Sequence, residues 1–464
     1  MHRLVSFASM PYLVVFIGFL VLWFGFDFNG LYGQDAHEYF RYSKALKLEM
    51  VEGIAAGDFH WPKLYSLLGA ILSFTGIPVL FSLELITLFS CLGAMYFAQK
   101  SIRLLYNVEG TLFLLLGAAT QVYFVRMGFV VMSDALCAFF IMATIYFYLS
   151  FNKNRDFKHL GWILLFSSLA IFTRYASLPI LVVLMTHSLW MFLKQWKFEV
   201  RVIGLFLLGI AGVCILYFNN QALSQIMDRI QEWSPINLFH RTHFREGRQE
   251  INFAPNLVYI GSNFLHLGFL SFGMLLLPWV KHWNFRQRVL WIAIMTYLFF
   301  IGGLEIQNQR FMVLTHLPIL ILIFPSFQQL KSWLELRKLM IPFVAGVLIF
   351  NLSLFLYSFG KTYQVHRIEK LIVEELHTFE DDTPILSFYV NQSFASYDLP
   401  NPTQDLWNAY PDFYKGGLVV FNPEKFEEFW SDGIVMQNWL SLKEQHELTV
   451  IRELPDNWKI YRIE

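Results

Sequence analysis

Charged residues are scarce in this chain. Only 15% of its 464 residues are Asp, Glu, Lys or Arg, whereas soluble domains carry about 25%. Hydrophobic residues make up 56% and gather into long runs, which predicts a polytopic α-helical membrane protein rather than a large soluble core. The formal net charge is zero, so the overall charge indicates no nucleic-acid partner.

Cysteine is also nearly absent. The chain has three cysteines, Cys91, Cys137 and Cys214, and each lies inside a hydrophobic run. Their spacing fits neither a metal site nor a disulfide framework, so we interpret them as small core residues. There is no internal repeat and no low-complexity stretch. The first apolar run, 7–26, lacks a small-residue cleavage site, which predicts a retained helix rather than a signal peptide.

The apolar runs and the basic loops between them predict a topology. A helix needs about 20 apolar residues to cross a bilayer. The run 62–77 is flanked by Trp-Pro and Gly-Ile-Pro, and the Lys- and Arg-rich loops all fall on the cytoplasmic side only if this run does not cross. We therefore predict a cytoplasmic N-terminus, an interfacial helix at 62–77 and about 11 transmembrane helices. The predicted spans are 7–26, 79–98, 110–127, 135–152, 160–173, 177–193, 202–218, 257–279, 289–304, 312–327 and 340–358.

The residues after 358 have a different composition, with shorter apolar runs separated by polar segments. Their pattern predicts strands at 384–390, 418–421, 448–454 and 458–463, and helices at 423–431 and 434–446. We therefore predict two domains: a transmembrane domain over 1–358 and a small C-terminal α/β domain over 359–464 on the outer, periplasmic side.

The predicted outer loops carry both acidic and basic residues. A carboxylate can take a proton from a hydroxyl, and the candidates for this are Asp35, Glu38 and Asp134. Arginine on the outer face opposes the positive-inside bias, so an anionic ligand at the membrane interface is the simplest reason for it. Together these groups suit sugar transfer from a lipid phosphate, which leaves as an anion. The candidates for binding the substrate are His37, His60, Lys63, Arg174, Arg241, Arg245 and Arg310.

Several of these residues also have a purely structural interpretation. Asp35 could cap a helix over 36–50, and Asp134 could cap the span that follows it. Arg174 could be a snorkelling residue at the end of a short span. The sequence alone leaves these alternatives open.

The same holds for the aromatic and imidazole groups. The aromatic residues within 39–42 fit interfacial side chains, and Lys63 could anchor an interfacial helix. His240 and His243 have the spacing that places two imidazoles on one helix face, which could hold a divalent metal ion. A lone histidine pair is more often a chance arrangement on a surface.

The order of these motifs resembles the GT-C superfamily of polyprenyl-phosphate-sugar-dependent glycosyltransferases. The first span is followed by Gly-Gln-Asp-Ala-His-Glu at 33–38 and by Trp-Pro-Lys-Leu-Tyr-Ser-Leu-Leu-Gly at 61–69. Ser133-Asp134 and Thr173-Arg174-Tyr175 follow later. The branch that the chain resembles most contains the protein O-mannosyltransferases and the lipid A aminoarabinose transferases. The resemblance covers most of 1–330, and its motifs are short.

The resemblance implies roles for individual residues. Asp35 matches the catalytic acidic residue of the first outer loop, and Asp134 matches a second acidic residue at the start of the fourth span. Arg174 matches a basic residue in a Thr-Arg or Thr-Lys element. The position after Asp35 departs from the common motif, since it holds alanine and the acidic partner arrives at Glu38. Further matches are His60 and Lys63, near a segment that approaches lipid phosphate or metal, and His240 and His243, in a loop that can carry metal ligands.

The resulting expectation is an inverting glycosyltransferase in a bacterial inner membrane. It would move a sugar from a polyprenyl-phosphate donor to a hydroxyl of a protein, lipid or glycan acceptor at the outer face. A divalent metal ion is the one cofactor that the sequence suggests. The competing hypotheses are a transporter or flippase, which would favour inverted repeats and polar residues at mid-membrane, and an assembly subunit.

Overall fold

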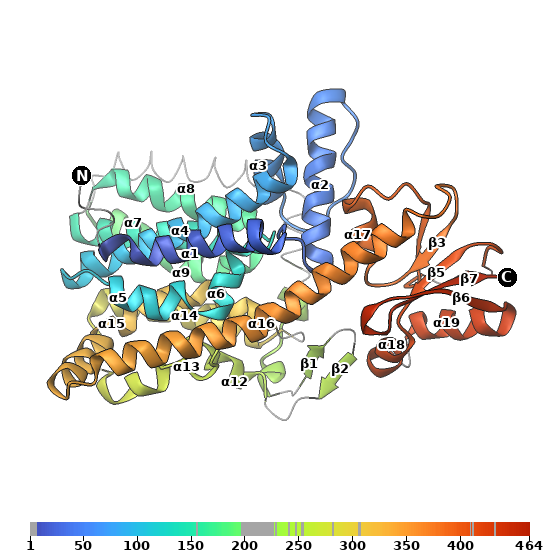
Figure 1. Cartoon of the computed structure of the whole chain (residues 1–464). Coiled ribbons are helices and arrows are strands. Elements are labelled where there is room, and N and C mark those ends of the chain that lie inside the picture. Colours follow the sequence, from blue (N-terminus) through green and yellow to red (C-terminus); the bar gives the residue numbers. More distant parts are fainter. Residues whose placement is uncertain are drawn as a thin grey trace, which may run out of the picture.

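The chain forms a long helical bundle with a strand-containing segment at one end (Figure 1). This arrangement is seen in a computed structural model that describes the following residues: 7–154, 156–195, 227, 230–239, 242–245, 248–251, 255–280, 283–304, 308–408, 410, 413–430 and 433–464. The bundle contains α1 (Met10–Leu20), α4 (Val79–Tyr106), α5 (Thr111–Leu114), α6 (Val122–Met127), α7 (Asp134–Asn154), α8 (Phe157–Thr173), α9 (Leu178–Gln195), α12 (Leu257–Ile260), α13 (Ser262–Leu265), α14 (Phe285–Gly302), α15 (Val313–Leu336) and α16 (Met340–Leu376).

Six helical segments of the described chain are long and apolar enough to cross a membrane. They agree with six of the spans predicted from the sequence, and they establish a membrane-embedded, mostly helical protein. The predicted span 202–218 lies outside the described residues, so the total of eleven stays a prediction. The six segments are Val79–Tyr106, Asp134–Asn154, Tyr175–Lys194, Phe285–Gly302, Gln309–Leu336 and Met340–Leu376.

Two of the other predicted spans are broken rather than continuous helices. The run 110–127 divides into α5, a π-helical stretch (Leu115–Ala119) and α6, and Gln121 between them has an extended backbone. The run 257–279 divides into α12, α13 and a 3-10 helix (Gly273–Trp279). The two breaks meet: Tyr123 N donates to the Gly268 carbonyl at 3.1 Å, and Gln121 Nε2 donates to Ser271 Oγ at 3.3 Å. Each break therefore satisfies polar groups that the other leaves free, as non-helical backbone inside a bilayer requires.

Two helices near the start of the chain do not run along the bundle. The polar helix α2 (Gly33–Glu52) lies across its end in Figure 1. The helix α3 (Leu64–Ser73) has only 10 residues. At about 1.5 Å per residue it is roughly half as long as the hydrocarbon core is thick, so 62–77 does not cross as a helix.

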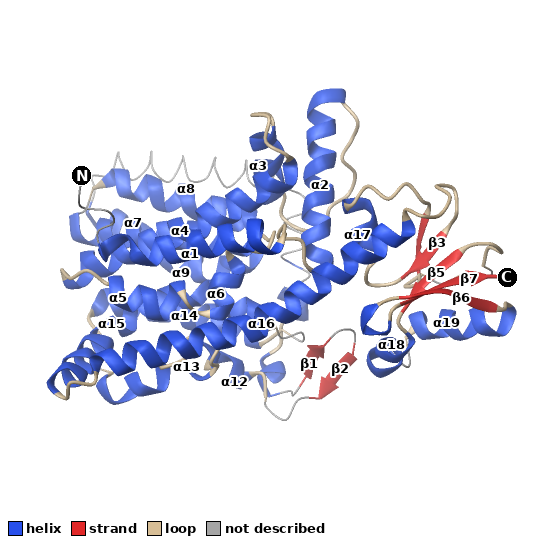
Figure 2. Cartoon of the chain, in the orientation of Figure 1, coloured by secondary structure: helices blue, strands red, loops and turns tan. Residues whose placement is uncertain are grey.

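The C-terminal segment contains a five-stranded sheet in the order β4-β3-β5-β7-β6 (Figure 2). The central strand β5 pairs in parallel with β3 and antiparallel with β7. The strands and helices predicted here are observed, while β4 and α17 arise inside a segment predicted as a loop. The elements are β3 (Ile385–Ser387), α17 (Asn391–Ser396), β4 (Thr403–Asp405), β5 (Leu418–Phe421), α18 (Pro423–Trp430), α19 (Ile434–Gln445), β6 (Leu448–Glu453) and β7 (Lys459–Ile463). A separate hairpin pairs β1 (Thr242–Arg245) with β2 (Arg248–Ile251).

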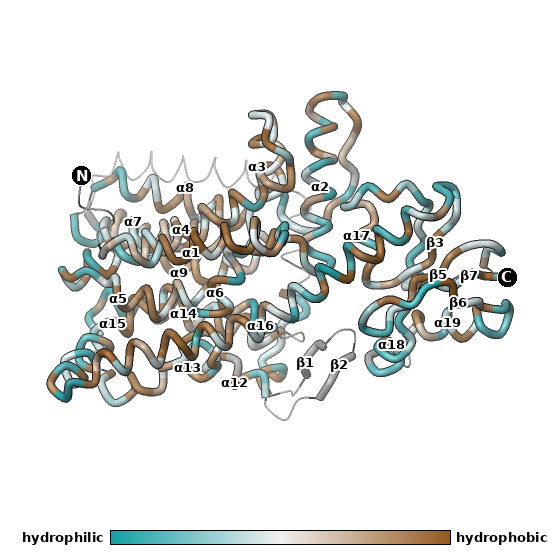
Figure 3. Tube along the Cα trace, in the orientation of Figure 1, coloured by the Kyte–Doolittle hydropathy of each residue, from teal (hydrophilic) through white to brown (hydrophobic). Residues whose placement is uncertain are grey.

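The helix α16 connects the bundle to the sheet without a break. Phe359 belongs to the hydrophobic core of the bundle, whereas Ile368 and Ile372, further along the same helix, belong to the core around the sheet. Figure 3 shows the change along this helix from a largely hydrophobic stretch to a more polar one. The predicted boundary at 358 therefore falls within a helix, and the division into two domains stays a prediction.

Polar contacts fasten the C-terminal segment to α2 and to the loop before it. The buried His37 of α2 lies 3.0 Å from Glu369 Oε2 and 2.9 Å from Ser396 Oγ. Lys44 pairs with Asp398 at 2.7 Å, and Lys370 pairs with Asp27 at 2.5 Å. The loop that leads into α2 is thus held between the bundle and the C-terminal segment.

The same loop passes close to the bundle at Gly30, which gives a first prediction. Gly30 has φ +75°, and a Cβ there would lie 2.8 Å from Val131 Cγ2 and 3.2 Å from the Phe129 carbonyl oxygen. Gly57 has φ +79° with nothing within 4 Å. We expect Gly30→Ala to lower the free energy of unfolding by about 1–3 kcal/mol more than Gly57→Ala, because only the first adds a steric clash.

Thermal unfolding midpoints of both variants, measured in one detergent, test this packing. Gly57→Ala is the control, since it carries the same backbone penalty in open space. Equal midpoints for the two variants would contradict the close approach at Gly30.

Candidate functional site

Two carboxylates and two arginines meet at one end of the bundle. Arg310 donates from Nη1 to Asp35 Oδ2 and from Nε to Asp134 Oδ2, both at 2.7 Å. Arg174 donates from Nη1 to the other oxygen of Asp134. We call Asp35, Asp134, Arg174 and Arg310 the acidic–arginine cluster.

Four separate elements place these side chains. Asp35 lies in the first turn of α2, and Asp134 is the first residue of α7. Arg174 follows α8 with an extended backbone, and Arg310 lies in a 3-10 helix whose N-cap Asn308 accepts from Arg310 N at 2.9 Å. Both carboxylates lie at helix N-termini, where the helix dipole favours negative charge. The cluster therefore depends on the packing of the whole bundle and not on one loop.

The two carboxylates have different surroundings. The Asp134 side chain is 4% exposed and is held by both guanidinium groups, whereas Asp35 is 35% exposed and, among the described residues, is paired with Arg310 alone. A buried carboxylate without cations would be strongly disfavoured, so Asp134 fits a fixed anchor for the arginines. Asp35 is the carboxylate that solvent or a substrate can reach.

The structure does not bear out the alternative interpretation of Asp35 as a helix cap. The helix begins at Gly33 rather than at 36, and its N-cap residue is Tyr32, which makes no side-chain capping hydrogen bond. The Asp35 carboxylate accepts from Arg310 instead. The ion pair with Arg310 is thus the interaction that fixes the position of the Asp35 side chain.

Tyr39 is a member of the site region that the sequence interpretation missed. Its hydroxyl lies 2.8 Å from Ser133 Oγ, next to Asp134, and its side chain is 3% exposed. Burial raises the pKa of the Tyr39 phenol to about 12, so the hydroxyl stays protonated at neutral pH. The interpretation of the aromatic residues in 39–42 as interfacial was wrong, because Tyr39, Phe40 and Tyr42 are all buried within the protein. The spacing of Asp35 and Tyr39, four residues apart on one helix, could have indicated that they share a face.

The other candidates on α2 and in the segment before α3 have contacts away from the cluster. Glu38 accepts from Arg41 Nε at 2.7 Å and from Arg41 Nη2 at 2.5 Å, on an exposed face of α2. His37 is held by Glu369 and Ser396. His60 is exposed next to Trp61, and the exposed Lys63 has its ammonium 5.7 Å from the centre of the Tyr42 ring. Their assignment to substrate binding or catalysis stays a prediction.

The predicted metal ligands lie mostly beyond what the structure describes. His240 and Arg241 are outside the described residues, and of His243 and Arg245 only the backbone, in β1, is described. No group of three His, Cys, Asp or Glu side chains among the described residues is arranged to hold a metal ion. The carboxylates of the acidic–arginine cluster are already paired with guanidinium groups, which does not fit a cation site. A divalent metal ion stays a prediction that rests on the histidines.

Known proteins resemble this chain in structure but not detectably in sequence. No protein-family model and no curated protein matches it. The crystal structure of ArnT from Cupriavidus metallidurans in the apo state aligns with a TM-score of 0.63 at 13% identity, over 98% of this chain and 97% of that one. The structure of the same protein bound to undecaprenyl phosphate aligns with a TM-score of 0.60 at 12% identity, over 98% of both chains. The chain therefore has the fold of ArnT along nearly its whole length, which confirms the resemblance to the GT-C glycosyltransferases at the level of the fold.

Proposed function

We propose that this protein is an integral-membrane inverting glycosyltransferase that uses a polyprenyl-phosphate-linked sugar. The single observation that carries the proposal is the acidic–arginine cluster at one end of an ArnT-like bundle. An ArnT structure contains undecaprenyl phosphate, which supports a polyprenyl phosphate as the lipid part of the donor. The cluster supplies the two functions that such a transfer needs, a base and a cation for the phosphate.

In the proposed reaction, the acceptor hydroxyl attacks the anomeric carbon of the sugar from the side opposite the phosphate. Asp35 takes the hydroxyl proton as the new carbon–oxygen bond forms. The bond between the anomeric carbon and the phosphate oxygen breaks, and the polyprenyl phosphate leaves with the electron pair as an anion. Inversion at the anomeric carbon follows from attack on the opposite face.

The arginines would act on the leaving phosphate. Arg310 already joins the accessible Asp35 to the anchored Asp134, so its guanidinium group would be within reach of a phosphate bound across the sugar from Asp35. Arginine suits this role because its planar fork of donors matches phosphate oxygens and its charge is permanent. Arg174 holds Asp134 from the other side and keeps the local charge balanced.

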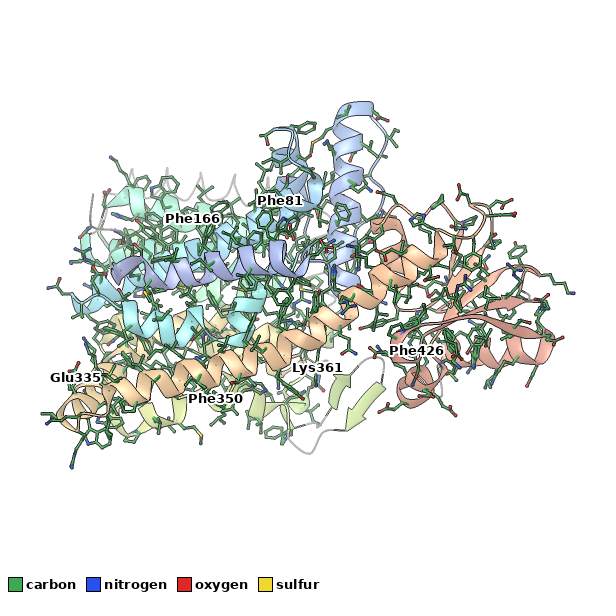
Figure 4. The ribbon with its side chains drawn as sticks, viewed as in Figure 1. Phe81, Phe166, Glu335, Phe350, Lys361 and Phe426 are labelled. Carbon is green, nitrogen blue, oxygen red and sulfur yellow. The ribbon has the colours of Figure 1, made fainter. Side chains whose placement is uncertain are left out.

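We further propose that the cluster and the C-terminal segment face the periplasm and that the N-terminus is cytoplasmic. The end of α15 and the turn before α16 carry Lys331, Arg337 and Lys338. Figure 4 shows Glu335, near the end of α15, at the end of the bundle opposite Phe426, which belongs to the C-terminal segment. Positive residues favour the cytoplasmic side, so this polarity supports the proposed orientation.

Substitution of Asp35 tests the proposed base. Asp35→Asn keeps the size of the side chain but cannot accept a proton, so we expect sugar transfer to fall by a factor of about 10² to 10⁴. Transfer from polyprenyl-phosphate sugars is measured in vesicles that contain the full-length protein, together with the affinity for undecaprenyl phosphate. Asp58→Asn, which changes an exposed aspartate between α2 and α3, is the control and should keep its activity. Full transfer activity of Asp35→Asn would refute the assignment.

Substitution of Arg310 tests the phosphate contact separately. Arg310→Gln removes a charged donor, so we expect the affinity for undecaprenyl phosphate to fall roughly ten- to a hundredfold, which corresponds to about 1.5–3 kcal/mol. Arg41→Gln is the matched control, because Arg41 pairs with Glu38 on an exposed face. An unchanged affinity of Arg310→Gln would contradict this role.

A further inference from the structure

A cavity lies between the end of α16 and the C-terminal sheet, apart from the acidic–arginine cluster. Its volume is about 290 Å³, and its walls come from α16, the segment after β3, the first turns of α18 and the turn before β7. The strands β3 and β5 run parallel, and the cavity lies beyond their carboxyl ends. Crevices at this place are where open sheets with parallel strands commonly bind ligands.

The cavity wall carries an excess of negative charge. The four carboxylates that line it, against the single ammonium of Lys425, give a formal charge of −3. Lys425 lies over the Tyr389 ring, with its Nζ 4.3 Å from the ring centre. The charge of the wall therefore favours a cationic ligand. The carboxylates are Glu369, Glu424, Glu428 and Asp456.

Glu369 is a buried member of this wall. Its side chain is only 1% exposed, and its Oε2 lies 3.0 Å from His37 Nε2. Its other oxygen, Oε1, accepts no hydrogen bond from the part of the chain that the structure describes. Glu369 therefore places at the cavity wall a carboxylate that His37 holds on one side.

The shape and lining of the cavity narrow the class of ligand. The described residues contain no cluster arranged to hold a metal ion, and the carboxylates come from three separate elements around the wall. Tyr389 and Trp458 also line the cavity, but Lys425 covers one face of the Tyr389 ring and Trp458 is buried, so the carboxylates are the groups that a ligand would contact. A volume of about 290 Å³ lies at the small end of the range for ligand pockets.

We propose that this cavity binds a protonated amine of about monosaccharide size, with the ammonium group next to Glu369. An amino sugar and a free polyamine both present this chemistry. The proposal concerns a site separate from the proposed transfer site and does not depend on sugar transfer.

The position of Glu369 also couples this cavity to α2. The same carboxylate contacts His37, which follows Asp35 by two residues on that helix. An ammonium group next to Glu369 competes with His37 for its negative charge and changes the contact that holds α2. Because such coupling is reciprocal, ligands at the acidic–arginine cluster would in turn change the affinity of the cavity for an amine.

Binding of amines to the full-length protein in detergent tests the site by isothermal titration calorimetry. The probes are glucosamine and 1,4-diaminobutane, with glucose as the uncharged comparison. We expect at least one amine to bind and glucose not to bind. Binding of glucosamine would indicate an amino sugar as the ligand, and binding of 1,4-diaminobutane would indicate a polyamine. Binding of neither amine, or equal binding of glucose, would overturn the proposal.

A matched pair of variants on α18 assigns the binding to the cavity. Both Glu428 and its neighbour Glu427 are exposed, but only Glu428 lines the cavity. We expect Glu428→Gln to weaken amine binding about fivefold, as for the loss of one partly exposed ion pair, and Glu427→Gln to leave it unchanged. Equal effects of the two variants would place the amine elsewhere.

Hydrogen exchange tests the coupling to α2. Saturation with the amine that binds should change the exchange rates of backbone amides around Asp35 and His37. The exposed amides that end α2, around Glu52, serve as the internal control and should not change. Unchanged exchange throughout α2 would overturn the coupling.

Discussion

The arrangement of the bundle end that carries the acidic–arginine cluster depends on how the charge of Asp134 is balanced. Asp134 starts a helix inside the bundle with a 4% exposed side chain, and an isolated carboxylate there would be costly. Two guanidinium groups remove this cost, and one of them, on Arg310, also reaches Asp35. The position of the accessible carboxylate is thereby tied to the buried one. The start of α2, the start of α7, the end of α8 and the segment before α15 must all converge for this to happen.

A second set of polar contacts holds α2 from the opposite side. His37 is buried between Glu369 and Ser396, and the Lys44–Asp398 and Lys370–Asp27 pairs lie around it. The exposed pairs contribute little each, but a buried hydrogen-bonded pair must keep its geometry because either partner alone would be unsatisfied. The C-terminal segment therefore acts on α2 directly, and α2 carries both Asp35 and His37.

The sequence indicated the cluster through charges on the unexpected side of the membrane and through short motifs. Asp35, Asp134, Arg174 and Arg310 were all named on that basis, and the structure brings them together. Glu38 and His37 were named because they are neighbours of Asp35 in sequence. Successive residues of a helix turn by about 100°, so these neighbours point elsewhere, while Tyr39, one turn later, returns to the side of the cluster. Helical spacing was thus a better guide on α2 than proximity in sequence.

The sequence by itself determined which segments are long apolar helices, most strands of the C-terminal sheet and, through the alternation of basic loops, that 62–77 does not cross. These features depend on local composition and period, which a single sequence contains. Only the tertiary structure decided that the runs 110–127 and 257–279 break, because their breaks satisfy each other's polar groups through Tyr123 and Gly268. It also decided that Arg310 joins two carboxylates that lie 275 and 176 residues away in sequence. An ion pair depends on the distance between charges after folding, and that distance is set by the packing of all the helices that lie between them.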